Sequence, residues 1–513
     1  MLFATLKVIG IAIEVVLLFN LLIVVHELGH FFAARWRGLK VEKFAIWFGK
    51  PVWSKTIGGV EYRLGSIPAG GFVAIPQLAP MEALEGETNE KGEDLPPARP
   101  LDKIIVAFAG PLASLSLAFL FACVVWFVGR PVSEAETTSV IGYVVPGGPA
   151  AKAGLQPGDK ILAVNGHRVT KIGGMGRMGD SVAWNVAVSD APVIPIRFVR
   201  DGQERVVEVE PLVEPNNGWG RKNLRQIQIA PAMTPMIAKV FPNSPAAEAG
   251  LRSGDLVVAA NGKPLLSPIP LAELLSTTKG ASVSLTIRRG EGRAVPLKWS
   301  SGLDTRLNTI NLHSIEWTVA ITPRIPDGQK QARIGILWDE RGMITLVHPS
   351  PSFQIKSSVL TMWETISALI SPRSEIGVQQ LSGPVGIMRI YYLLFQSPMG
   401  WQLALWFSVV LNVNLAVMNL LPLPVLDGGH ILLALIEWFL GHPIHQKTLE
   451  IVQSGFAMLL IGTMLYISFF DVSDLVTGHK SATASTLDKA ETMIFSTPAS
   501  SAVPTQTPAE AKP

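Results

Sequence analysis

Long apolar runs separated by more polar stretches are the dominant pattern along this chain. Four runs are long enough to cross a hydrocarbon layer of about 30 Å, and they cover residues 7–34, 104–128, 401–421 and 451–470. A backbone that crosses lipid must satisfy its hydrogen bonds internally, so each run predicts a helix. The expected fold class is therefore a polytopic α-helical membrane protein with four transmembrane helices.

The first apolar run carries a candidate metal site at its end. Its outline, Lys7 followed by apolar residues, is also that of a signal peptide. We favour a retained helix because the run ends in His26-Glu27-Leu28-Gly29-His30 instead of a small-residue cleavage site. Histidines at i and i+4 share one helix face, where they can bind one Zn²⁺ with the glutamate as general base. Since ionisable groups at membrane depth are costly and usually functional, this pattern predicts a zinc peptidase acting within the bilayer.

Composition agrees with a membrane protein, and charge placement predicts its orientation. Hydrophobic residues make up 48% of the chain and charged residues 16%, which is few charges for a soluble protein of this length. The net charge of +3 gives no indication of nucleic-acid binding, and the single cysteine, Cys123, excludes a disulfide framework within the chain. Basic residues gather directly after the first run, so that loop is expected to be cytoplasmic. Both termini and the region between helices 2 and 3 are then extracytoplasmic.

The segment between the first two apolar runs has its own pattern. Short β-type stretches alternate with glycines over residues 47–73, which predicts hairpins ending in Pro68-Ala69-Gly70-Gly71-Phe72-Val73. Residues 76–100 are acidic and rich in proline, so we expect a mobile surface loop there.

An internal repeat lies between the second and third runs. Eleven of the eighteen residues in 149–166 recur 96 residues later, in 245–262. Each copy contains a short helix, a Gly-Leu helix stop, a Gly-Asp turn, an apolar strand and an Asn-Gly turn. The copies resemble PDZ domains of bacterial proteases, which bind a peptide as an added strand. They are equally compatible with spacers or steric filters, because residues 227–231, where a glycine-rich carboxylate-binding loop is expected, contain no glycine.

The candidate site needs a third protein ligand, and Asp427 is the best candidate. It follows the third apolar run within Asn419-Leu-Leu-Pro-Leu-Pro-Val-Leu-Asp427-Gly428-Gly429-His430, at the same predicted membrane depth as His26 and His30. An aspartate before two glycines is otherwise typical of a turn. Catalytic zinc sites usually have three protein ligands, so we interpret Asp427 as the third. His430 is interpreted as a supporting or structural residue, and His442 and His445 as interfacial.

These motifs together resemble the site-2 protease family, and within it the bacterial RseP type. The resemblance rests on HELGH, on Gly110-Pro111 in the second run, on the Asp427-Gly428 motif and on the paired PDZ-like repeats, and it covers residues 1–470. It implies a zinc-dependent intramembrane endopeptidase of the bacterial inner membrane. Such an enzyme cleaves single-pass membrane proteins in regulated intramembrane proteolysis, with anti-sigma-factor-like proteins or remnant signal peptides as substrates.

The resemblance also assigns roles to individual residues. It makes His26, His30 and Asp427 the ligands of one Zn²⁺ and Glu27 the base. It implies substrate handling by Asn414 and Asn419, although each is also compatible with an interhelical hydrogen bond. It further implies a membrane-associated β-loop that pairs with the unwound substrate through Gly70, Gly71, Phe72 and Val73. One departure is Ser114, where the family often has asparagine, which leaves the polar contacts of the second helix in question.

The expected divisions of the chain follow from these patterns. They are 1–36 (helix 1), 37–103 (cytoplasmic β-loop region), 104–129 (helix 2), 135–215 and 225–300 (PDZ-like domains), 301–398 (strands and an amphipathic helix), 401–430 (helix 3 with the Asp-Gly motif), 449–471 (helix 4) and 477–513 (disordered tail). The expected partners are membrane-protein substrates, the lipid bilayer and peptide C-termini at the PDZ-like domains. A non-catalytic scaffold is the first alternative, but it has no need of the full ligand set. A metal transporter is the second, but inverted repeats are not apparent.

Overall fold

The computed structural model describes residues 2–78, 98–215, 220–278, 280–290, 314–329, 331–339, 344–372, 374–397, 399–442, 446–477 and 495. Most of the predicted acidic loop, the tail beyond Thr477 apart from Phe495, and His445 lie outside these residues.

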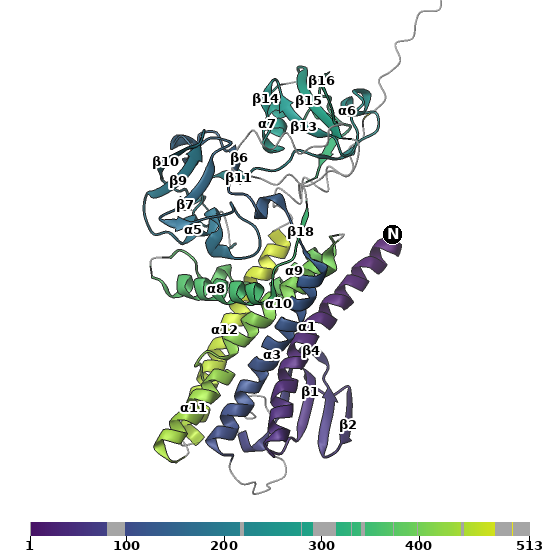
Figure 1. Ribbon diagram of the computed structural model, residues 1–513. Coiled ribbons are helices and arrows are strands. Elements are labelled where there is room, and N and C mark those ends of the chain that lie inside the picture. Colours follow the sequence, from purple (N-terminus) through teal and green to yellow (C-terminus); the bar gives the residue numbers. More distant parts are fainter. Residues whose placement is uncertain are drawn as a thin grey trace, which may run out of the picture.

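Four long apolar helices run side by side in the lower part of the molecule (Figure 1). They are α1 (Leu2–Trp36), α3 (Pro100–Val128), α10 (Gly400–Asn419) and α12 (Gln446–Thr477). Each is long and apolar enough to span a bilayer, which confirms the four helices predicted from the apolar runs. Helices α1 and α3 pack closely at Gly29, where a Cβ atom would lie 2.3 Å from the carbonyl oxygen of Ala109. This close crossing positions the two faces that build the site.

A small sheet lies beside α1, at the end of the bundle away from the N-terminus (Figure 1). Its strands are β1 (Lys43–Phe48), β2 (Trp53–Ile57), β3 (Val60–Leu64) and β4 (Ile67–Ala74), in the order β2-β3-β1-β4. Strands β2 and β3 form a hairpin, β1 pairs with β3 in parallel, and β4 pairs antiparallel with β1. One of the predicted hairpins is therefore present. Strand β4 is at the edge of the sheet, where its outer side can accept another strand.

Two β-rich units lie together at the opposite end of the bundle (Figure 1). The first unit contains β6 (Ile141–Val144), α4 (Pro149–Lys152), β7 (Lys160–Val164), β8 (His167–Arg168), α5 (Val182–Val188), β9 (Ile194–Arg200), β10 (Gln203–Val209) and β11 (Ile229–Pro231). The second contains β12 (Ile237–Val240), α6 (Pro245–Glu248), β13 (Leu256–Ala260), β14 (Lys263–Pro264), α7 (Ile269–Thr277), β15 (Val283–Gly290), β16 (Ser314–Ile321) and β17 (Ile336–Trp338). The elements follow one another in the same order, as the sequence repeat predicts.

Each unit is closed by a strand that lies beyond the repeat. Strand β11 pairs antiparallel with β6, and β17 pairs antiparallel with β12. Both units therefore extend past the boundaries 135–215 and 225–300, and the start of the second range belongs to the first unit. A closing strand of three residues has too few positions for a periodic pattern, and its partner is remote in sequence, so the repeat alone could not reveal it.

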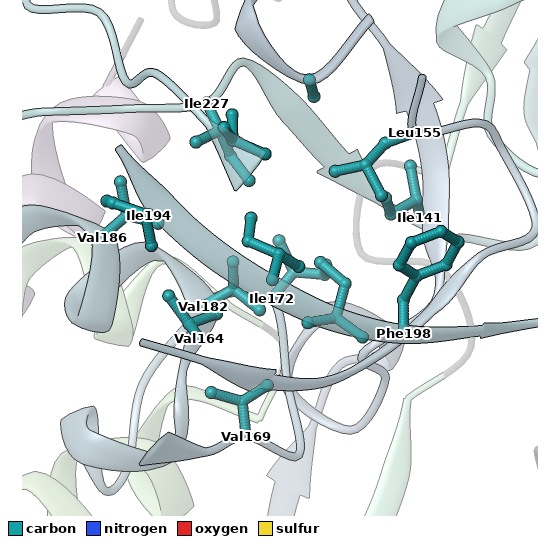
Figure 2. Packing of buried hydrophobic residues seen from close by; sticks show 14 residues of the cluster. Ile141, Leu155, Val164, Val169, Ile172, Val182, Val186, Ile194, Phe198 and Ile227 are labelled. Carbon is teal, nitrogen blue, oxygen red and sulfur yellow. The ribbon is translucent and has the colours of Figure 1, made fainter. Parts of the chain in front are cut away.

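Alternating side chains build the core of each unit. Along β9, Ile194, Ile196 and Phe198 are buried and the residues between them are exposed, which is the period of a strand packed on one face. Figure 2 shows Ile194 and Phe198 in the first unit's cluster, together with Ile141 and Leu155. A separate cluster around Val257, Leu271 and Ile287 fills the second unit. The units thus have independent cores.

Shorter elements connect the units to the helices. Strand β5 (Arg130–Val132), which follows α3, pairs with β18 (Thr345–Val347), which precedes α8 (Pro351–Ile370). Helix α8 matches the amphipathic helix predicted for this region, and its Glu364 carboxylate accepts a hydrogen bond from the backbone N–H of Gly179 at 2.9 Å. Helices α9 (Pro384–Phe395) and α11 (Asp427–Leu440) flank α10 and were not predicted.

Candidate metal centre

The two histidines of the first membrane helix point at one another. His26 and His30 are each 6% exposed, and their Nε2 atoms are 3.3 Å apart. The i, i+4 spacing places both rings on the α1 face that meets α3. The local helix is uninterrupted because residues 2–36 contain no proline and glycine occurs only at Gly10 and Gly29.

Asp427 joins the two histidines from a different part of the chain. Helix α10 ends at Asn419, and α11 begins at Asp427 after a segment that contains Pro422 and Pro424. The carboxylate oxygens of Asp427 lie 3.3 Å from Nε2 of His26 and 3.4 Å from Nε2 of His30. One ligand atom from each residue lies within 4.8 Å of the others. The structure therefore brings together the three predicted ligands.

Contacts from α3 orient both imidazole rings. Nδ1 of His30 donates to the carbonyl oxygen of Val106 at 2.8 Å, which leaves its Nε2 as the lone-pair atom. Nδ1 of His26 lies 3.0 Å from the hydroxyl of the fully buried Ser114. A second contact that fixes the ring is the usual support for a metal-binding histidine. Ser114, the departure from the family pattern, thus contacts a predicted ligand directly.

Gly110 leaves the space in which the donor atoms meet. A Cβ atom at this position would lie 2.2 Å from Nε2 of His30 and 2.9 Å from Nε2 of His26. No heavier side chain fits there without moving the rings. Gly110 and Gly29 together therefore allow α3 to approach α1 closely at the level of the histidines.

The donor set fits a zinc ion. Asp427 is 6% exposed, and within the described residues its Oδ2 has no hydrogen-bond partner. An unbonded buried carboxylate oxygen is unfavourable unless a cation neutralises it. Two neutral imidazole nitrogens and a carboxylate form one of the common catalytic zinc sets, with a coordination position left for water.

A cavity of about 120 Å³ opens beside these donors. Glu27 lies in its wall, one residue along the helix from His26. Lys103 and Glu437 also line it and form an ion pair at 2.8 Å between α3 and α11. His430 lines it too, so its place is beside the cavity. Sequence reasoning missed the ion pair because the two residues are remote in sequence and belong to no motif.

The predicted substrate-handling residues lie on two elements, strand β4 and helix α10. Gly71 and Val73 of β4 lie beside the cavity: Val73 lines it, and a Cβ on Gly71 would contact the Glu27 side chain at 3.4 Å. Asn419 lies close to the donors, with Nδ2 3.1 Å from Nε2 of His26. Asn414 sits further along α10, and its buried Oδ1 has no hydrogen-bond partner among the described residues.

A second candidate site lies in the second β-rich unit. A groove of about 600 Å³ runs between α7 and residues 331–338, which include β17. Gly335 stands at the start of this strand with φ +79°, a conformation that favours glycine. In the first unit the equivalent position is Gln228, with φ +58°. A glycine at this position, which residues 227–231 lack, therefore occurs in the second unit, in Arg333-Ile334-Gly335-Ile336.

Comparison with known proteins places most of the chain in one family. Residues 14–462 match peptidase family M50. The chain is 31% identical over 469 residues to a Neisseria meningitidis protein named "Putative zinc metalloprotease", covering 89% of this chain and 97% of that one. It is 28% identical over 481 residues to the regulator of sigma-E protease RseP of Salmonella typhimurium, covering 88% and 96% respectively. A Yersinia pestis protease RseP is 28% identical over 478 residues, covering 88% and 96%.

Proposed function

The chain belongs to peptidase family M50 and is a zinc metalloprotease, and from that premise we propose that it cleaves single-pass membrane proteins at the cavity between α1, α3 and α11. The observation that carries the proposal is the convergence of His26, His30 and Asp427 on helices long and apolar enough to span a bilayer. Ionisable groups so placed are expensive, and a bound cation accounts for their cost.

In this proposal His26, His30 and Asp427 hold one zinc ion, and Ser114 and the Val106 carbonyl orient the rings. When bound, zinc supplies a Lewis acid that polarises the scissile carbonyl and acidifies water. Glu27 accepts the proton of the attacking water and then delivers it to the leaving amine. Its place in the cavity wall beside His26 supports this role.

Strand β4 is proposed to hold the substrate extended. A helical substrate hides its peptide bonds in its own hydrogen bonds, so it must unwind before cleavage. Strand β4 is an edge strand, and Gly71 and Val73 place it next to Glu27. An unwound segment added to this edge satisfies its backbone groups and passes the catalytic side chains. Asn419, whose Nδ2 lies 3.1 Å from Nε2 of His26, then donates to the scissile region.

We assign the small sheet to the cytoplasmic side and the β-rich units to the extracytoplasmic side. The basic residues that follow α1 support this orientation. The two β-rich units are then PDZ-like domains that contact the outer part of a substrate. The groove between α7 and β17 is the better candidate for a peptide C-terminus, since Gly335 opens the turn that leads into β17. Sigma-E regulation in the named relatives favours anti-sigma-factor-like substrates.

Proteolysis in reconstituted membranes tests the assignment. A single-pass substrate with labels at both ends is incubated with wild type, Glu27→Gln and His26→Ala proteins, and bound zinc is measured in each. Glu27→Gln is expected to keep zinc and lose cleavage, while His26→Ala loses both. Glu14→Gln is the matched control, because Glu14 is an exposed glutamate of the same helix, and it should cleave normally. Normal cleavage by Glu27→Gln would rule the mechanism out.

The same variant identifies substrates. Glu27→Gln expressed in place of the wild type should retain intact membrane proteins that the wild type removes. Accumulation of single-pass proteins already shortened on their outer side supports regulated intramembrane proteolysis. Accumulation of short leftover signal peptides instead assigns a clearance role to the enzyme.

A further inference from the structure

Phe495 is buried although it lies far beyond the last membrane helix. It is 4% exposed and packs with Phe241 and Leu337 of the second unit. The family match ends at residue 462, so Phe495 lies outside the matched region although its partners lie within it. It is also independent of the catalytic assignment.

The surface beneath Phe495 is shaped for an aromatic ring. Phe241 is 3% exposed, yet it belongs to a cluster with Phe495 and not to the unit's own core. A Cβ at Gly335 would lie 2.2 Å from Cβ of Ser244 and 2.9 Å from the Phe495 ring. The missing side chain therefore makes room for both Ser244 and the ring.

A cation completes the site. The Arg324 guanidinium lies 5.9 Å from the centre of the Phe495 ring, a distance at which a cation attracts an aromatic face. Arg324 is itself held by hydrogen bonds to the Asn243 carbonyl at 2.6 Å and to the Glu248 carboxylate at 2.7 Å. Its position is thus fixed by groups of the second unit, as expected for a preformed binding surface.

The first unit lacks this surface at equivalent positions. Val145 stands where the second unit has Phe241, and it remains 36% exposed. Gln228 replaces Gly335, and Ala230 replaces Leu337. Phe241, which packs with Phe495 and Leu337, is only 3% exposed. The two units share a fold, but one alone carries an aromatic site that is filled.

We propose that the second β-rich unit binds the chain's own C-terminal tail through Phe495, at the surface formed by Phe241, Leu337, Gly335 and Arg324. The contact links this unit to the end of α12, from which the tail departs. Leu337 also lines the groove between α7 and β17. The docked tail and a peptide in that groove would therefore contact the same strand. Burying one phenyl ring favours the docked state about ten- to a hundredfold.

Site-specific photo-cross-linking in the full-length protein tests the proposal. A photoreactive phenylalanine analogue is placed at position 495, and cross-linked peptides are identified by mass spectrometry. Cross-links are expected to residues 237–241 and 335–338, and to be strongly reduced by Phe241→Ala. Val145→Ala, at the matched position of the first unit, should leave them unchanged. The same analogue at Phe439, which is 89% exposed, controls for non-specific capture.

Two further measurements test whether the contact forms within one chain and whether it protects the second unit. A mixture of isotopically heavy and light chains separates contacts within one chain from contacts between copies, and predominantly mixed cross-links would refute docking of the chain's own tail. Since Phe241→Ala could disturb the unit, hydrogen exchange is also measured in Phe495→Ala, whose substitution lies outside it. Severalfold faster exchange in residues 237–241, restored by Phe495→Trp, is expected. Unchanged exchange would also refute the proposal.

Discussion

Buried carboxylates occur in the metal centre and in both β-rich units, but their surroundings differ. Asp159 and Asp255 are each 1% exposed, and each accepts two hydrogen bonds from an arginine and one from a backbone N–H. Asp427 is nearly as buried, but its Oδ2 has no hydrogen bond among the described residues. The hydrogen bonds of Asp159 and Asp255 account for their burial, whereas an incompletely bonded carboxylate beside a cavity indicates a site for a cation.

The two ion pairs are also copies of each other. Arg200 binds Asp159 at 2.6 and 2.7 Å and the Gly154 carbonyl at 2.8 Å, and Arg289 repeats the arrangement with Asp255 and Gly250. The same contact is therefore present in both units. The donors of the metal centre have no such copy, since they come from helices that meet only once.

Asp427→Asn should give the largest effect. The amide is a poor zinc ligand, so we expect cleavage to fall by about a thousandfold or more, with loss of bound zinc. In the presence of a chelator the variant should unfold no earlier than wild type, because it removes an incompletely bonded buried charge. Activity, zinc content and thermal unfolding are the measurements. A variant that retains zinc but unfolds much earlier would make Asp427 a structural residue.

Asp159→Asn and Asp255→Asn should show the opposite pattern. Each leaves an arginine with a weaker partner, and we expect each unit to lose about 2–3 kcal/mol of unfolding free energy. Zinc content per folded molecule should not change. Local stability is measured by hydrogen exchange in β7 and β13. Glu316→Gln is the control, because the Arg288–Glu316 pair has a carboxylate that is 47% exposed and should contribute little.

Ser114→Ala tests whether the contact between Ser114 and His26 supports zinc binding. It removes the hydroxyl that lies 3.0 Å from Nδ1 of His26, but it leaves all three proposed zinc ligands in place. Loss of such a supporting contact typically costs ten- to a hundredfold in metal affinity, and we expect that range in zinc competition titrations. Ser116→Ala is the matched control, since the Ser116 hydroxyl lies on the same helix and donates to the Leu112 carbonyl of that helix. Equal affinity in the two variants would show that Ser114 does not support the site.

The sequence predicts this centre better than the parts around it, for physical reasons. HELGH and Asp427 are recognisable because zinc chemistry restricts residue types, and apolar runs are recognisable because lipid restricts composition. Helix α11 was missed because it begins directly after the prolines that end the preceding segment. Strand β11 was missed because its partner is remote in sequence. Strands were expected within residues 301–398, but the pairing of β17 with the distant β12 was not. The role of Gly335 was missed for the same reason, and the contact of Phe495 because nothing around it is periodic.

A solvent-exposed carboxylate gives the smallest predicted effect. The Tyr143 hydroxyl of the first unit donates to the Glu273 carboxylate of the second at 2.8 Å. Partial burial, and then this hydrogen bond, raise the pKa of Tyr143 from 10 to about 12. A raised pKa means that the contact favours the protonated phenol, so it is fully present below pH 10 and lost as the pH rises from 10 to about 12. The effect should be small because Glu273 is exposed.

Distances between the two units measure that loss. Spin labels at Val206→Cys and Ile315→Cys, in a Cys123→Ser background, report one site on each unit. The wild-type distance distribution should broaden as the pH rises through this window, whereas Tyr143→Phe should already be broader at pH 8 and change less. Identical distributions at every pH would show that the hydrogen bond does not orient the units.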